Sequence, residues 1–186
     1  MAVQNGDSEQ AMHLRAIRGG YGVFLASQAV VYVTVIAVRY LMAYGRVGPY
    51  SQGLGAVITL AMIISVLATR SSRAAVKNGD LGSMAGRLMI GTVLGLAAFV
   101  LVLIQWVNLR ASGLPVTTPT LEVYFTLTGF WLLYALIGIF LLVAARSRGL
   151  RVGYTPDNHW DLDAATYMWE FVTIAWVVSY VVLYFA

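Results

Sequence analysis

Glu170 is the side chain whose position most demands a chemical explanation. It lies in "YMWEFVTIAW", residues 167–176, inside a long apolar stretch. A charged side chain at the centre of a membrane-spanning helix costs about 3 kcal/mol on insertion scales, so such residues usually have a partner and a function. Gln28 is the corresponding polar residue in the first apolar stretch of the chain.

The two side chains are expected to lie at the same depth. Gln28 lies six residues after Gly22 and Glu170 six residues after Ala164, so each is about 9 Å into its predicted helix. An amide can hydrogen-bond a carboxyl group in either protonation state, which predicts that Gln28 pairs with Glu170. The alternative is that Glu170 reaches toward the membrane interface without a specific partner.

Other polar and aromatic residues in the apolar stretches are candidates for a hydrogen-bond network or for lipid contact. Thr166 and Thr173 share the helix face of Glu170. Gln105 and Asn108 predict hydrogen bonds between helices, and Arg39 predicts contact with the membrane interface or a lipid phosphate. The tryptophans and tyrosines fit an interfacial belt, helix packing or a site equally well. The full candidate set is Thr166, Thr173, Arg39, Gln105, Asn108, Trp131, Tyr134, Trp169 and Trp176.

No catalytic or metal centre is recognisable in the sequence. The two histidines, His13 and His159, lie outside the apolar stretches, and there is no cysteine, so we expect no haem, copper or thiolate site. The segment "DNHWDLD", residues 157–163, alternates acidic residues and one histidine but lacks the glycine and final glutamate of a calcium loop. A solvated acidic loop in which Asp163 caps the following helix is the preferred interpretation.

The composition places these residues in a membrane protein. Hydrophobic residues make up 60% of the 186-residue chain, charged residues 11%, and the mean hydropathy is +0.77, which excludes an ordinary soluble domain. The net charge of +4 does not indicate nucleic-acid binding, because most basic residues lie between apolar stretches. We predict an all-α fold, an integral membrane bundle of five transmembrane helices, at residues 22–43, 53–69, 86–109, 121–145 and 164–186.

The basic residues predict the orientation of the bundle. Nine of the 12 flank one side, and only Arg39, Arg46 and Arg110 flank the other. The positive-inside rule then puts the N-terminus in the cytoplasm and the C-terminus outside, in a bacterial cytoplasmic membrane. Residues 1–20 lack the apolar core of a signal peptide and are expected to form a cytoplasmic segment, either a short surface helix or a disordered tail, before a single domain at residues 21–186.

Taken in order, several segments resemble subunit III of the haem-copper oxidases (cytochrome c oxidase), in its five-helix bacterial form. "MWEFVTIAW" (168–176) is similar to the pattern of the family's last helix. "YFTLTGFWLLYALIGIFLL" (124–142) is similar to its Thr-Gly-Phe-His segment, and "FLASQAVVY" (24–32) to its Ser-Glu stretch. "KNGD" (77–80) and the later "LIQWVN" (103–108) also fit. The resemblance covers nearly all of residues 20 to 186, in order.

The chain departs from the family pattern at its polar positions. Gln28 stands where the family usually has Glu, and Glu170 stands where it usually has His. Thr173 replaces the usual Asp, and Asn108 the usual Glu, while Trp131 and Tyr134 stand where histidines are common. In the family, the acid of the first of these helices and the His of the last lie together beside bound lipid. This branch is therefore divergent, and an amide at position 28 does not titrate.

The resemblance implies a non-catalytic subunit that stabilises a terminal oxidase and binds phospholipid in aerobic electron transport. It further implies no cofactor in this chain, haem and copper in partner subunits, and contact with catalytic subunit I and with subunit II. A subunit-III-like accessory protein of a nitric oxide reductase is an alternative. A small transporter is another, although no internal repeat is visible and only Gln28, Glu170 and the two threonines share a level.

Overall fold

Five long helices make up nearly the whole chain. The computed structural model describes the backbone of residues 2–44, 46–156 and 158–185, and within these ranges the side chains of Met12 and of residues from Leu14 onward. The helices are α1 (Ala2–Ala43), α2 (Gln52–Lys77), α3 (Leu81–Ala111), α4 (Pro119–Arg151) and α5 (Trp160–Tyr184). Each has a segment long and apolar enough to cross a membrane, and the described residues contain no strand. The predicted all-α bundle of five membrane-spanning helices is confirmed.

The observed helices extend beyond the predicted spans. α1 continues without a break through residue 20, so the first helix is much longer than the predicted span 22–43. α2 continues past Thr69 to Lys77, which puts Arg70 and Arg73 in the helix rather than in a loop. α5 begins at Trp160, so Asp163 lies in its first turn and does not cap it. The apolar pattern marks the hydrocarbon core, whereas the helix ends lie farther out, where polar residues are tolerated.

Capping residues, a glycine and a proline mark where the helices begin and end at the short connections. The Ser51 hydroxyl accepts a hydrogen bond from the Leu54 N–H at the start of α2, and the Asp80 carboxylate accepts one from the Ser83 N–H at the start of α3. Gly79, with φ of 74°, makes the reversal between α2 and α3, a backbone conformation that suits glycine. Pro119 begins α4 at a position that needs no N–H donor.

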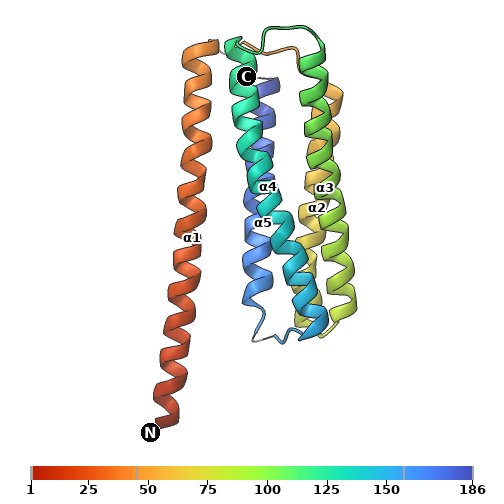
Figure 1. Cartoon of the computed structure of the whole chain (residues 1–186). Coiled ribbons are helices and arrows are strands. Elements are labelled where there is room, and N and C mark those ends of the chain that lie inside the picture. Colours follow the sequence, from red (N-terminus) through yellow and green to blue (C-terminus); the bar gives the residue numbers. More distant parts are fainter. Residues whose placement is uncertain (1, 45, 157, 186) are drawn as a thin grey trace.

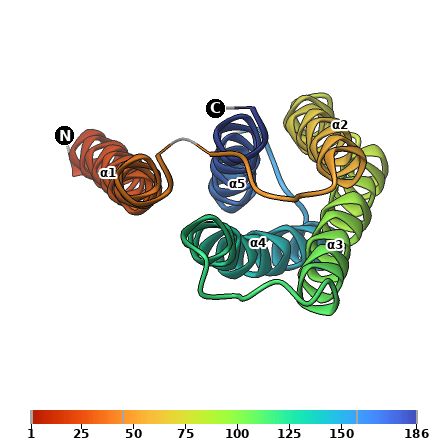
Figure 2. The ribbon, with the colours of Figure 1, turned by 90° about the horizontal axis from the view of Figure 1, so that it is seen from above.

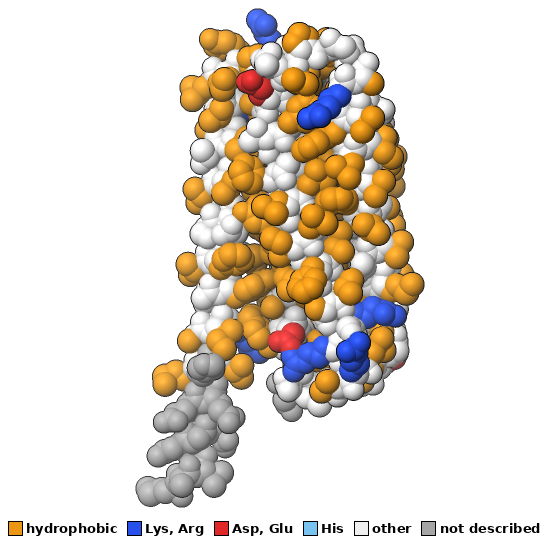
Figure 3. All heavy atoms as spheres, viewed as in Figure 1, with side chains coloured by type: hydrophobic (Ala, Val, Ile, Leu, Met, Phe, Trp, Pro, Cys, Tyr) orange, Lys and Arg blue, Asp and Glu red, His pale blue; other side chains and the backbone are white. Residues whose placement is uncertain are grey.

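The helices form a packed group of four with α1 on one flank. α2 packs against α3 and α5, α3 against α4, and α4 against α5, whereas the described residues of α1 contact α4 and α5 (Figures 1 and 2). Figure 1 also shows α1 reaching well beyond the other helices at the end of the bundle where α5 begins. Figure 3 shows apolar side chains along the length of one face, with Lys and Arg near its two ends, as expected for a surface that faces lipid.

Tryptophan side chains fill the centre of the bundle. Trp131, Trp169 and Trp176 are all buried, and each indole N–H has an acceptor: the Val172 carbonyl (3.0 Å), the Ser65 hydroxyl (2.8 Å) and the Thr59 hydroxyl (2.9 Å), respectively. Among the interpretations left open by the sequence, these three residues therefore serve helix packing. They are satisfied polar anchors within an apolar core.

Candidate functional site

The partners of Glu170 are two arginines of α2. Arg70 donates two hydrogen bonds to its carboxylate, from Nε to Oε1 (2.8 Å) and from Nη2 to Oε2 (3.2 Å), and Arg73 donates a third to Oε1. The arginines lie one turn apart on α2 and face α5. The Glu170 side chain is 15% exposed, that of Arg73 21% and that of Arg70 58%, so the Arg73 pair is much less hydrated than the Arg70 pair.

The charge pairing continues toward the start of α5. Arg73 Nη1 lies 4.0 Å from Asp163 Oδ1, and His159 Nε2 lies 3.5 Å from Asp163 Oδ2. We call Arg70, Arg73, Glu170, Asp163 and His159 the ion cluster. It joins the end of α2 to the beginning of α5, and its members alternate in charge when His159 is protonated.

The structure corrects the predicted pairing of Gln28 with Glu170. The Gln28 carbonyl oxygen accepts a hydrogen bond from the Tyr134 hydroxyl (2.6 Å), and its amide nitrogen donates to the Ser27 hydroxyl (2.9 Å) and the Phe24 carbonyl (3.4 Å). Glu170 bonds Arg70 and Arg73 instead. Depth along a helix does not fix direction around it, and a bidentate guanidinium binds a carboxylate more strongly than an amide does.

Thr166 and Thr173 do not extend the ion cluster. Both are buried, and each hydroxyl donates to the carbonyl four residues earlier in α5, that of Leu162 (2.7 Å) and that of Trp169 (2.9 Å). A threonine inside an apolar helix commonly satisfies its hydroxyl in this local way.

Three further polar candidates lie toward the opposite end of the bundle. Arg39 is only 2% exposed and donates to the Arg46 carbonyl (3.3 Å) in the connection between α1 and α2, so this part of its guanidinium is bonded within the chain. Burial raises the pKa of the neighbouring Tyr50 phenol, and the Arg39 charge opposes part of that rise. Gln105 is buried near Tyr184, but its amide makes no hydrogen bond within the described residues. Asn108 is exposed.

The two acidic residues in the first turn of α5 are engaged in ion pairs. Asp161 pairs with Arg148, and Asp163 with Arg73 and His159. Asp157 lies outside the described residues. Among the residues that the structure describes, no group of three or more His, Cys, Asp and Glu side chains is arranged to hold a metal ion.

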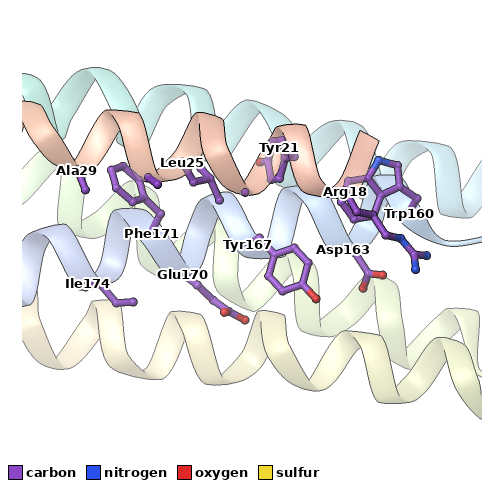
Figure 4. A pocket seen from close by; sticks show the side chains of 12 residues that line it. Arg18, Tyr21, Leu25, Ala29, Trp160, Asp163, Tyr167, Glu170, Phe171 and Ile174 are labelled. Carbon is purple, nitrogen blue, oxygen red and sulfur yellow. The ribbon is translucent and has the colours of Figure 1, made fainter. Parts of the chain in front are cut away.

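A pocket of about 610 Å³ lies between α1 and α5 beside the ion cluster (Figure 4). One end is polar and is lined by Asp163 and by Arg18, whose guanidinium lies 5.3 Å from the centre of the Trp160 ring. Glu170 lies farther along the pocket, between Tyr167 and Ile174 (Figure 4). The other end is apolar, and its side chains include Leu25, Ala29, Phe171 and Ile174. We call this space the α1–α5 pocket. A charged mouth over an apolar interior suits an amphipathic molecule.

Sequence reasoning missed Arg70 and Arg73 as partners of Glu170. The predicted second span ends at residue 69, which leaves both arginines in the connection that follows it. The available signal was their spacing of three residues, which puts two cations on one helix face if the helix continues.

A double-mutant cycle distinguishes the two possible partners of Gln28. We expect Gln28→Leu and Tyr134→Phe each to lower the free energy of unfolding by about 0.6–1.7 kcal/mol, the range measured for hydrogen bonds between membrane helices, and the double variant to lose less than the sum. Gln28→Leu and Glu170→Gln should instead be additive. Chemical unfolding in detergent measures the wild type and all five variants, and a strong coupling of Gln28 to Glu170 would restore the original pairing.

A family model and curated relatives that match this chain carry the same description. Residues 47–186 match the family model described as cytochrome c oxidase subunit III. Curated relatives named cytochrome c oxidase subunit 3 include those of Hippopotamus amphibius, 36% identical over 61 residues, and Bos mutus grunniens, 34% identical over 61 residues. These alignments cover 33% of this chain and 23% and 24% of the two relatives, so the chain matches only about a quarter of their length.

Proposed function

The chain belongs to the cytochrome c oxidase subunit III family, and from this premise we propose that it is a non-catalytic subunit of a respiratory haem-copper oxidase. The observation that carries the proposal is the continuous family match from residue 47 to residue 186, which spans all of α2 to α5. The five apolar helices make it a multi-pass membrane protein. Its function would be to stabilise the catalytic subunit in the membrane during aerobic electron transport.

We assign the redox chemistry to partner subunits. Haem and copper would be held by catalytic subunit I and its neighbour subunit II. In this chain, His159 is engaged with Asp163 and with the Thr155 carbonyl. Trp131 and Tyr134, which stand where the family commonly has histidines, are buried and hydrogen-bonded within the bundle.

We propose that the N-terminus lies in the cytoplasm of a bacterial cell. The support is the unequal distribution of cations, since α2 and α4 carry arginines close to where they end, and the ion cluster lies at the same end of the bundle. Short cytoplasmic connections are enriched in Lys and Arg. The C-terminus would then lie outside.

The α1–α5 pocket is the proposed phospholipid site of this subunit. Its apolar interior would accept an acyl chain, and Arg18 at its mouth would contact a phosphate. Two carboxylates also line the pocket, but Glu170 is paired with Arg70 and Arg73, and Asp163 is shared between Arg73 and His159. Their charges therefore oppose a bound phosphate less than free carboxylates would.

Purification through a tag on this chain tests the proposed function. In mild detergent we expect a haem-copper catalytic subunit to co-purify and to give a haem absorption spectrum, while the chain separated from its partners gives none. As a control, a tagged membrane protein of similar size from the same cells should not retain the haem protein. Haem or copper bound by the isolated chain, or an oxidase that purifies without it under all mild conditions, would contradict the proposal.

A further inference from the structure

A second groove lies on the other flank of α1, at the opposite end of the bundle from the ion cluster. It has a volume of about 580 Å³ and runs between α1 and α4 where α3 ends. Val35, Val38 and Met42 of α1 form one wall, and Val123 and Phe125 of α4 form the other. Met42 is 49% exposed, so this wall is open to the membrane. We call it the α1–α4 groove.

Two opposite charges line the same groove. Arg110, at the end of α3, lies with its guanidinium 5.8 Å from the centre of the Phe125 ring, and Glu122 lies in the first turn of α4. Both side chains are exposed, and among the described residues neither forms an ion pair within 4.0 Å. An Arg and a Glu that line one apolar groove without neutralising each other can each bind part of a ligand.

We propose that the α1–α4 groove binds a zwitterionic phospholipid of the phosphatidylethanolamine type. Its phosphate would accept hydrogen bonds from Arg110, its ammonium group would donate to Glu122, and an acyl chain would lie between α1 and α4. An anionic headgroup is the poorer fit because Glu122 repels it. A choline headgroup is also poorer, because its quaternary nitrogen has no N–H to donate.

This site is separate from the α1–α5 pocket in place and in charge. That pocket lies at the ion-cluster end, where its carboxylates already have arginine or histidine partners. The α1–α4 groove offers one cation and one anion, which is the charge pattern of a zwitterionic headgroup. The inference therefore does not require the oxidase assignment.

Native mass spectrometry of the delipidated full-length chain tests the proposal. The protein is equilibrated in detergent with equal amounts of phosphatidylethanolamine and phosphatidylglycerol. We expect wild-type protein to retain the former over the latter by about fivefold, which corresponds to roughly 1 kcal/mol for an exposed charge pair. Glu122→Gln should bring the ratio close to one, and Glu122→Lys should favour phosphatidylglycerol. Arg110→Gln should lower binding of both lipids at this site.

Matched variants keep the test decisive. Ala29→Trp fills the α1–α5 pocket and should leave the lipid ratio of the groove unchanged, while Ala37→Trp, on the same helix but among the lining residues of neither site, should change neither lipid count nor ratio. Circular dichroism identifies any variant that does not fold. A wild-type ratio near one, or a ratio that Glu122→Gln does not alter, overturns the proposal. Failure of an oxidase to co-purify would refute the proposed function and leave this result unaffected.

Discussion

Gly95→Val is expected to lower the free energy of unfolding by about 3 kcal/mol or more, the upper range for overpacking a tight core. Trp169 is fully buried, and its ring lies directly against the backbone of Gly95 on α3 and of Gly138 on α4. A Cβ atom at Gly95 would overlap the indole ring, which has no room to move because Gly138 holds its other side. Thermal unfolding in detergent, followed by near-UV circular dichroism, measures the loss.

Gly86→Val is the matched control for this prediction. Gly86 lies on the same helix, and a Cβ atom added there would meet nothing within 4 Å. The control should unfold within about 0.5 kcal/mol of wild type, as surface substitutions usually do. A second variant tests the cause: Gly95→Val combined with Trp169→Leu should recover part of the loss, because the smaller side chain leaves space. Equal stability of Gly95→Val and Gly86→Val would show that the Trp169 ring does not lie against Gly95.

Glu170→Leu is expected to lower the free energy of unfolding by about 3 kcal/mol, the lower end for breaking a buried ion pair. The change removes the acceptor of three hydrogen bonds and leaves Arg73, whose side chain is 21% exposed, without its closest anion. The loss should change little with salt, because pairs shielded from water are weakly screened. Urea or SDS unfolding at two ionic strengths measures both effects.

Asp161→Asn provides the comparison. Asp161 also lies on α5 and also pairs with an arginine, Arg148, but both side chains are at least 40% exposed. Such a pair contributes about 0–1 kcal/mol, and less at high salt. If the two substitutions cost the same, the ion cluster would have no greater role than an ordinary surface pair.

The fold was predictable because every segment that crosses a membrane meets the same physical requirement. Each apolar stretch must satisfy its own backbone hydrogen bonds, so five such stretches give five helices whatever their side chains do. The positions of the spans follow from hydropathy alone. The ends of the helices do not, because α2 continues through Arg70 and Arg73 in a region where polar residues carry little penalty.

The partners of the polar side chains were not predictable in the same way. Gln28 and Glu170 were matched by depth, but Gln28 faces Tyr134 of α4 while Glu170 faces α2. That direction depends on which helices are neighbours, and the order of the helices in the chain does not determine this. α1 is followed by α2, but its described residues pack against α4 and α5. The bond from Arg39 to the Arg46 carbonyl was not predictable for a similar reason, since that carbonyl comes from a local reversal of the chain.

The position of α1 on the flank of the bundle has a mechanical consequence (Figure 2). Tyr32, in the second half of α1, is held by ring contacts with Tyr134 of α4 and Phe171 of α5. The α1–α5 pocket lies on one side of that point and the α1–α4 groove on the other, on opposite flanks of the helix. If α1 tilts as a rigid helix about Tyr32, its two ends move in opposite directions. A tilt of α1 in one direction would therefore narrow both the α1–α5 pocket and the α1–α4 groove, and the opposite tilt would widen both. Molecules bound in the two spaces would then oppose the same tilt of α1.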